Sequence, residues 1–368
     1  MPLSAYVHIP FCKSKCKYCS FVSYSGCKES EQSDYVDTLL KEIDKFYKNE
    51  QLKTLYFGGG TPSSLSVDKL SLILNKFKFD SETEVTIEVN PETVDLEKFV
   101  NLKNVGFNRV SIGVQSFDDS ILKSIGRIHS SKKAAKAVEM AQNAGFDNVS
   151  VDFMYGLPNQ SLNSFCDDLK KAVKLGVNHI SLYGLKIEEG CYFYNNQPKN
   201  TADDDLQADM YLAAINLLEN LGFFHYEISN FGQNGYESKH NLNYWNDETY
   251  YGFGAGAHGY CVDNDEYVRY ANYSVLNEYK DNYHKRAEQV ILTKQMRLEE
   301  SVFLGFRRAN GIDLEEINKK FSIDFDNKFA LIIKKYLDSG HIVKTDKGYK
   351  FSPQGFLLSN IILADFIC

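Results

Sequence analysis

Three cysteines follow the first apolar segment of the chain, where residues 6–19 read YVHIPFCKSKCKYC. Cys12, Cys16 and Cys19 stand four and three residues apart, whereas the remaining cysteines are scattered along the chain. A structural zinc ion takes four ligands, and no fourth ligand is near, because Cys27 lies eight residues further on. Three thiolates can instead hold a 4Fe-4S cluster and leave one iron open to another ligand. The spacing therefore favours an iron–sulfur cluster.

The composition is that of a soluble globular protein and excludes several classes of partner. Of 368 residues, 43% are hydrophobic, and 41 Lys and Arg against 49 Asp and Glu give a net charge of −8. This balance argues against nucleic acid as a partner, because such surfaces concentrate positive charge. No apolar run approaches the roughly 18 residues of a transmembrane segment, and the first ten residues do not resemble a signal peptide. We expect a cytoplasmic protein whose cysteines are ligands or buried thiols.

The first half of the chain alternates short β-branched or aromatic runs with amphipathic stretches, which predicts repeated βα units. The predicted strands are Ala5–Ile9, Thr54–Phe57, Glu84–Val89, Arg109–Val114, Asn148–Met154 and His179–Leu185. Parallel strands joined by helices place their active loops at the carboxyl ends of the strands. Chemically informative residues stand at those ends, namely the loop 58–62 (GGGTP), Glu88, Gln115 and Asp152. The fold class is therefore α/β, with a partial (β/α) barrel.

The pattern changes after the barrel repeat. We expect barrel units over 1–190 and a segment over 191–290 that completes the barrel, with a helix over 202–221, a strand over 225–229 and then a loop rich in Gly, Asn and Tyr. Over 291–368 the pattern predicts helices at 294–308, 314–320 and 327–339, a hairpin around 346–348 and a final helix opened by Pro353. These elements indicate a small winged-helix-like C-terminal domain.

Five short motifs occur in a fixed order: YxHxPFC (6–12), GGGTP (58–62), IEVNP (87–91), GVQSF (113–117) and DFMYGLP (152–158). With CxxxCxxC they resemble the radical S-adenosylmethionine superfamily. Within it, the chain resembles the family of oxygen-independent coproporphyrinogen III oxidases and their relatives. The resemblance implies a partial barrel that binds a 4Fe-4S cluster and S-adenosylmethionine. It also implies an electron donor such as flavodoxin or ferredoxin.

The resemblance assigns a role to each candidate site residue. Cys12, Cys16 and Cys19 would hold the cluster, and the loop of Gly59, Gly60 and Thr61 would approach the methionine moiety. Tyr6 and Tyr18 would flank the cofactor, whose polar groups would form hydrogen bonds with Glu88 and Gln115. Arg127 would meet a carboxylate of the cofactor, and Asp152 would lie beside these residues. Taken singly, each polar side chain is more commonly explained by an ion pair or a helix cap, and that explanation weakens for the set as a whole. We expect residues 6–158 to form this site without the middle segment.

Two departures separate the chain from the oxidases. Phe21 stands where they carry a fourth cysteine, and the tyrosine of the first motif is already residue 6. The middle segment contains HNLNYW at 240–245, in which a histidine beside aromatic rings suits haem, although a packed histidine is the ordinary explanation.

A three-cysteine loop, a short N-terminus and HNxxYW occur together in the haem chaperones of this family. This resemblance implies haem bound at His240 and delivered to acceptor proteins, membrane cytochromes among them, with a homodimer as a further expectation. The alternative function is the oxidase reaction, in which propionate side chains are oxidatively decarboxylated to vinyl groups. The sequence leaves open whether the protein is an enzyme.

Overall fold

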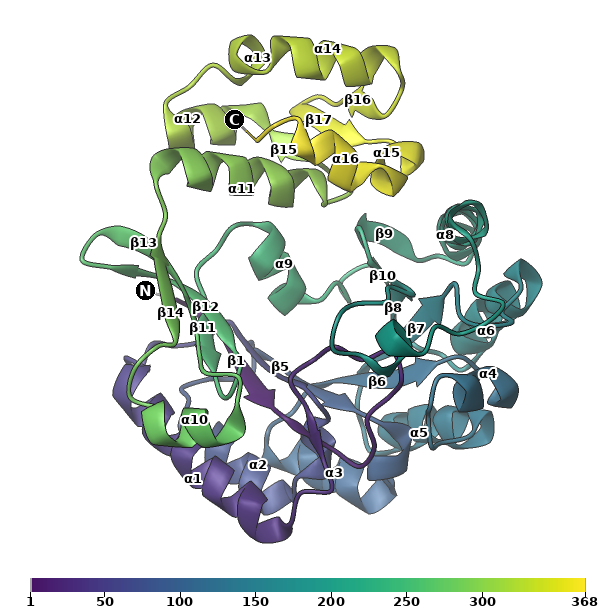
Figure 1. The fold of residues 1–368 in the computed structure, drawn as a ribbon, viewed down its shortest axis with the longest axis vertical. Helices are drawn as coiled ribbons and strands as arrows, with labels where there is room; N and C mark the ends of the chain where they lie inside the picture. The colour runs from purple at the N-terminus through teal and green to yellow at the C-terminus, as the bar shows by residue number, and fades with distance from the viewer. Residues whose placement is uncertain (1, 368) are drawn as a thin grey trace.

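A nine-stranded sheet in the order β11-β1-β4-β5-β6-β7-β8-β10-β9 forms the main body of the protein (Figure 1). The computed structural model describes residues 2–367. The strands of this sheet are β1 (Ser4–Ile9), β4 (Thr54–Gly59), β5 (Glu84–Val89), β6 (Arg109–Gln115), β7 (Asn148–Tyr155), β8 (His179–Gly184), β9 (Phe224–Glu227), β10 (Asn230–Gly232) and β11 (Tyr251–Phe253). Pairing is parallel from β11 to β8, whereas β10 runs antiparallel to both β8 and β9. All six strands expected from the sequence are present.

Helices connect the parallel strands and cover the outside of the curved sheet (Figure 1). They are α1 (Glu29–Phe46), α2 (Val67–Leu74), α3 (Leu96–Val105), α4 (Asp119–Ser124), α5 (Ser131–Asn143) and α6 (Leu162–Lys174), with 3-10 turns at Pro62–Ser64 and Pro91–Thr93. Two further helices, α7 (Tyr192–Asn195) and α8 (Asp204–Asn220), follow β8 and lead to the antiparallel strands. The short strands β2 (Phe11–Cys12) and β3 (Tyr24–Ser25) bracket the cysteine loop. Side chains that accept backbone N–H groups begin several helices, as Ser161 does for α6. These caps explain why the helix starts were readable from the sequence.

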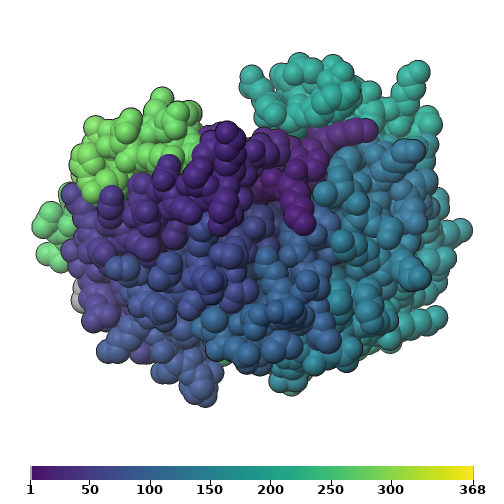
Figure 2. Space-filling view, turned by 90° about the horizontal axis from the view of Figure 1, so that it is seen from below, coloured from purple at the N-terminus to yellow at the C-terminus, as the bar shows by residue number. Residues whose placement is uncertain are grey.

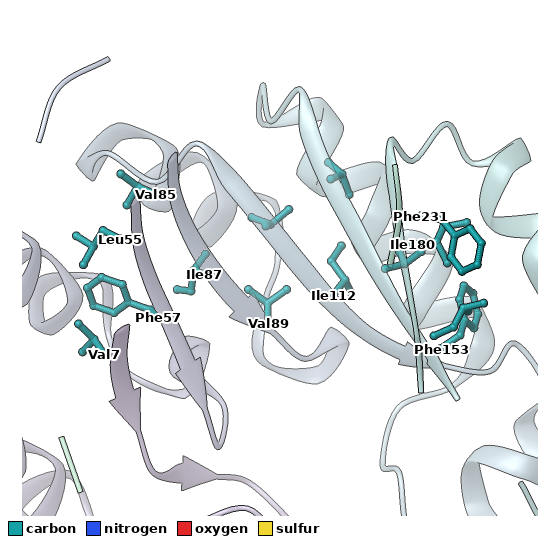
Figure 3. Packing of buried hydrophobic residues seen from close by; sticks show 14 of the residues in the cluster. Val7, Leu55, Phe57, Val85, Ile87, Val89, Ile112, Phe153, Ile180 and Phe231 are labelled. Atoms are coloured by element: carbon teal, nitrogen blue, oxygen red, sulfur yellow. The ribbon is translucent and has the colours of Figure 1, made fainter. Parts of the chain in front are cut away.

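The two faces of the barrel sheet differ in polarity, because successive side chains of a strand point to opposite sides. Figure 3 shows the apolar face, where Phe57, Ile87 and Ile112 pack with neighbouring strands in the hydrophobic core. The alternating positions carry polar groups: Tyr56 and Glu88 line one cavity inside the barrel. The hydrophobic core thus lies between sheet and helices, and the barrel interior is left to polar side chains.

The middle segment is more ordered than the loop expected from its composition. It contains α9 (Lys239–Trp245), β11, the three-stranded sheet β12 (His258–Asp263), β13 (Glu266–Ala271) and β14 (Glu288–Ile291), and α10 (Leu276–Asn282). The loop prediction was wrong because β11 is short and gains its stability by pairing with β1, far away in the sequence. Such non-local pairing leaves little trace in local composition.

The C-terminal part forms a small domain beyond α9 (Figure 1). It comprises α11 (Lys294–Phe306), β15 (Ile312–Asp313), α12 (Leu314–Phe321), α13 (Phe325–Lys328), α14 (Ala330–Asp338), β16 (Ile342–Lys344), β17 (Gly348–Phe351), α15 (Pro353–Leu357) and α16 (Ser359–Ala364), with sheet order β15-β17-β16. The helix expected over 327–339 is broken at Phe329, whose backbone is not helical and whose ring is buried. No helix within residues 2–367 is both long and apolar enough to cross a membrane.

Candidate functional site

The glycine loop at the carboxyl end of β4 packs directly against the first strand. Gly59 has a φ of 113°, and a Cβ there would lie 2.4 Å from the His8 ring, so only glycine fits. A Cβ on Gly60 would lie 3.0 Å from the carbonyl oxygen of Ile9. The Gly59 N–H donates to Glu88 Oε2 at 3.1 Å. The loop is therefore held close to the start of the cysteine loop with exposed backbone, as an approach to a cofactor requires.

Two carboxyl groups lie inside the barrel beside this loop. Glu88 also accepts a hydrogen bond from the Tyr56 hydroxyl at 2.8 Å, and Asp152 accepts one from Ser111 at 3.0 Å. Burial, and then the negative charge of Asp152, raise the pKa of Glu88 to about 7. Burial likewise raises the pKa of Asp152. The interior thus holds two carboxyl groups that interact and ionise less readily than ordinary acids.

The cysteine loop connects to the barrel through two polar residues. Cys12 Sγ lies 3.4 Å from Thr61 Oγ1, and Arg127 Nη1 donates to Cys16 Sγ at 3.4 Å. Arg127 Nη2 donates to Asn90 Oδ1 at 2.7 Å. Figure 2 shows the purple N-terminal segment crossing the surface between a green and a teal segment. The cysteine loop thus lies at the surface, over the carboxyl ends of the strands.

The three thiols fit a cluster by their chemistry. Cys12, Cys16 and Cys19 are free and partly exposed, so no disulfide competes for them. Burial raises the pKa of Cys12 and Cys19, and the neighbouring Cys16 raises both further, which places the three sulfur atoms within electrostatic reach of one another. Over residues 2–367, no three metal-ligating side chains converge as they stand. Side-chain rotation within the loop would have to complete the set.

Gln115 and Tyr18 border the same region. Gln115 ends β6 at a register shift, in a left-handed backbone conformation with a φ of 67°. A Cβ on Gly113 would meet Arg127 Nη2, Asn90 Oδ1 and Gln115 Nε2, so these polar groups share one spot. Tyr18 interacts with Cys16 and Arg127, and its pKa is raised, first by burial. The structure therefore brings the expected residues of the first 158 positions together.

His240 lies at the other end of the barrel. Its Nδ1 is 2.7 Å from Thr54 Oγ1, and Thr54 begins the strand that ends at Gly59. Five residue steps of about 3.3 Å separate these ends by roughly 17 Å. His240 Nε2 is 2.7 Å from the Tyr244 hydroxyl, so both ring nitrogens have protein partners. Burial, reinforced by the charge of Arg109, lowers the pKa of His240 to about 3. The ring is neutral and locked in place.

One cavity nevertheless joins the two ends. It has a volume of about 200 Å³ and is lined by Tyr6, Tyr56, Glu88, Arg109, Ser111, Ser181, Tyr183, His240, Asn241 and Tyr244. The His240 ring stacks on Tyr56 at a centroid distance of 5.0 Å, and Tyr56 in turn holds Glu88. Residues of the middle segment therefore line the same cavity as Tyr6 and Glu88, because α9 closes the amino-terminal end of the barrel. The expectation that residues 6–158 form the cofactor site by themselves stays a prediction.

Sequence reasoning missed Tyr56, Asn90 and Arg109 as parts of the site. A signal existed in the period of two along the strands, where Tyr56 and Arg109 occupy the polar positions between core residues. Asn90 stands directly after a strand end, inside a motif already noted for Glu88. Only the folded structure shows that it bridges Thr61 and Arg127.

Comparison with known proteins decides the family. The chain is 37% identical over 379 residues to heme chaperone HemW of Lactococcus lactis, and the match covers 98% of both chains. The chain belongs to the HemW family. HemW of Bacillus subtilis is 36% identical over 99% of both chains, and HemW of Escherichia coli is 40% identical over 70% of both. The resemblance to haem chaperones seen in the sequence is confirmed by these relatives.

Two further comparisons concern the superfamily and the fold. Residues 6–172 match the Radical SAM superfamily, and residues 292–358 match the HemN C-terminal domain. The solved structure of coproporphyrinogen III oxidase (HemN) from Escherichia coli superposes with a TM-score of 0.84 at 23% identity, covering 100% of this chain and 90% of the other. The predicted partial barrel with a small C-terminal domain is thereby confirmed.

Proposed function

We propose that this protein binds a 4Fe-4S cluster, S-adenosylmethionine and haem, and transfers haem to acceptor proteins such as membrane cytochromes. The observation that carries the proposal is similarity along nearly the whole chain to proteins named heme chaperone HemW. The free thiols of the surface loop support a cytoplasmic location, because they need a reducing compartment.

The carboxyl ends of the strands would form the cofactor site. Cys12, Cys16 and Cys19 would hold the cluster, which when bound offers an open iron and one transferable electron. Gly59 and Gly60 pack against His8 and the backbone of Ile9, which holds this loop beside the cysteine loop, where the methionine moiety would approach it. Arg127 carries a permanent positive charge toward this spot and suits a carboxylate. Glu88 and Asp152 supply negative charge for a sulfonium cofactor.

His240 remains the proposed haem contact. Its Nε2 faces the Tyr244 hydroxyl, so iron can approach only if that hydroxyl withdraws. The neutral ring is chemically suited to ligation, because a protonated imidazole could not donate to iron. Tyr244 lies one turn further along the same short helix, so a rotation of the Tyr244 side chain, rather than a movement of α9 as a whole, would release the nitrogen.

The surroundings of the cysteine loop suit an acidic electron donor such as flavodoxin or ferredoxin. Lys13 directly follows the first cysteine and borders a surface pocket of about 610 Å³ with Lys132, Lys133 and Lys136. This group of lysines stands out on a chain of net charge −8. Opposite charges would guide an acidic partner toward the thiols.

One anaerobic experiment tests the proposal. The full chain is reconstituted with iron and sulfide, loaded with haem, and mixed with an apo-haemoprotein, while absorption spectra follow the haem. We expect four irons per chain, a Soret band, and transfer of that band to the acceptor. In a parallel reaction with coproporphyrinogen III, S-adenosylmethionine and a reductant, vinyl products without haem transfer would establish the alternative oxidase function instead.

A further inference from the structure

Arg109 is a buried cation without a partner. It begins β6, is 2% exposed and is the largest fully buried side chain among the residues that the structure describes. Its Nε is buried without a hydrogen-bond partner, and across residues 2–367 the guanidinium makes no hydrogen bond or ion pair with another side chain or carbonyl. Arg127, in contrast, is bonded to Cys16 and Asn90. A buried guanidinium of this kind is strongly disfavoured unless an anion meets it.

The guanidinium borders the barrel cavity. Ser111, Ser181 and Tyr183 line the same cavity and surround Arg109 with hydroxyl groups. Tyr183 keeps 46% of its surface accessible, which marks where the cavity opens toward the barrel mouth. A volume of about 200 Å³ is below the range of pockets that enclose a whole drug-sized ligand. The cavity therefore has room for a short side arm of a ligand rather than for a macrocycle.

The neighbouring acids do not neutralise Arg109. Glu88 is engaged by Tyr56 and Gly59, and Asp152 by Ser111, and neither carboxylate lies at ion-pair distance from the guanidinium. Burial raises the pKa of both carboxyl groups against the opposing charge of Arg109, and the pKa of Glu88 reaches about 7. The positive charge of Arg109 also reaches His240 and His179, both of which are held neutral. The charge of Arg109 acts on both acids, but no carboxylate within residues 2–367 forms an ion pair with it, which leaves its donors open to an external anion.

We propose that Arg109 binds a carboxylate carried into the barrel by the ligand, namely one propionate of haem. This assignment rests on the proposed haem function. The planar guanidinium fork matches a carboxylate in a bidentate arrangement, whereas the hydroxyl group of Ser111 is already used by Asp152. The propionates are the ionised groups at the periphery of haem, and their short arm fits the cavity. The macrocycle would then lie across the opening at Tyr183.

The test compares haem with haem dimethyl ester, in which the propionate charges are masked. Both are titrated into the reconstituted full-length protein and into Arg109→Gln, Arg109→Lys and the control Arg269→Gln, whose native side chain pairs with Glu300 outside the barrel interior. We expect Arg109→Gln to weaken haem binding roughly ten- to hundred-fold and to leave the affinity for the ester unchanged. Arg109→Lys should restore part of the loss, and the control should behave as the parent.

Equal affinity of the parent protein for haem and for the ester would overturn the assignment, and this comparison needs no variant to fold. Cluster content and circular dichroism check the fold of Arg109→Gln. A folded variant that binds haem as tightly as the parent would also overturn the assignment while leaving the chaperone function in place. A parent protein that binds neither haem nor its ester would overturn the proposed function and this assignment together.

Discussion

Removal of the Glu88 carboxylate should weaken S-adenosylmethionine binding by a measurable factor. In Glu88→Ala the Gly59 N–H and the Tyr56 hydroxyl both lose their acceptor, at 3.1 and 2.8 Å respectively. A buried donor left without a partner costs about 1–3 kcal/mol. If the loss of one such hydrogen bond weakens the binding free energy of S-adenosylmethionine by this amount, the affinity falls by about 5- to 150-fold. The loss of negative charge near the sulfonium would weaken the binding of the cofactor further.

The pH dependence gives a second signature of the same carboxyl group. Its pKa of about 7 in the folded protein lies above the ordinary value of 4.5, so protonation favours the folded state. That stabilisation is fully present below about pH 4.5 and is lost as the pH rises through about 7. Cofactor affinity should show the opposite trend and rise from pH 6 to pH 8, because the ionised carboxylate attracts the cationic cofactor. Glu88→Gln should abolish this slope.

Calorimetry on anaerobically reconstituted protein measures both effects. Glu139→Ala is the matched control, because Glu139 is exposed on α5 and pairs only with Lys136 at the surface. Iron and sulfide content must equal that of the parent, so that a missing cluster is not mistaken for weak binding. An unchanged affinity in Glu88→Ala, or the same pH slope in Glu88→Gln as in the parent, would show that Glu88 does not contact the cofactor.

Three further predictions concern the other parts of the site. Cys16→Ser should prevent assembly of the 4Fe-4S cluster, because oxygen is a poor substitute for thiolate at iron, whereas Cys166→Ser should not. Iron and sulfide analysis measures this, and a full cluster in Cys16→Ser would contradict the ligand assignment. His240→Ala should shift or abolish the Soret band. It should also weaken the binding of S-adenosylmethionine about two- to five-fold, because the stacking of the ring on Tyr56 is lost. The control is His129→Ala, which removes another buried histidine and should leave the haem spectrum unchanged. Lys133→Glu should slow reduction of the cluster by flavodoxin at low ionic strength, and the difference should vanish in high salt; a salt-independent rate would argue against docking at this pocket.

The barrel strands were predictable because their signal is local. Each of the six expected strands carries apolar residues at every second position, and this alternation is read within six to eight residues. The strand ends then located Glu88 and Asp152, since parallel strands share one functional edge. The edge strand β11 has only three residues, and its partner β1 lies some 240 positions earlier. No local pattern specifies such a pairing.

At the site, too, contacts between residues distant in the sequence could not be predicted from local patterns. The motifs identified the residues of the cofactor end, but the state of each side chain depends on neighbours brought by the fold. HNxxYW gave His240 as a histidine beside aromatic rings, and only the structure shows both nitrogens bonded, to Thr54 and to Tyr244. The alternation of the strand marks Arg109 as a polar position but does not show what the guanidinium meets. Its significance appears only when the barrel closes around it and supplies no counter-ion.

The contacts across the barrel connect the two proposed ligand sites. From the amino-terminal end, His240 stacks on Tyr56, Tyr56 donates to Glu88, and Glu88 holds the backbone of Gly59 at the carboxyl-terminal end. Iron ligation at His240 requires the Tyr244 hydroxyl to leave, and a shift of the His240 ring toward the iron would alter the surface on which Tyr56 rests. Haem and S-adenosylmethionine would then bind with a coupling free energy that is the same in both directions, because linkage is reciprocal. A chaperone built on this barrel can therefore use the cofactor to set how tightly haem is held, even if the cofactor is never cleaved.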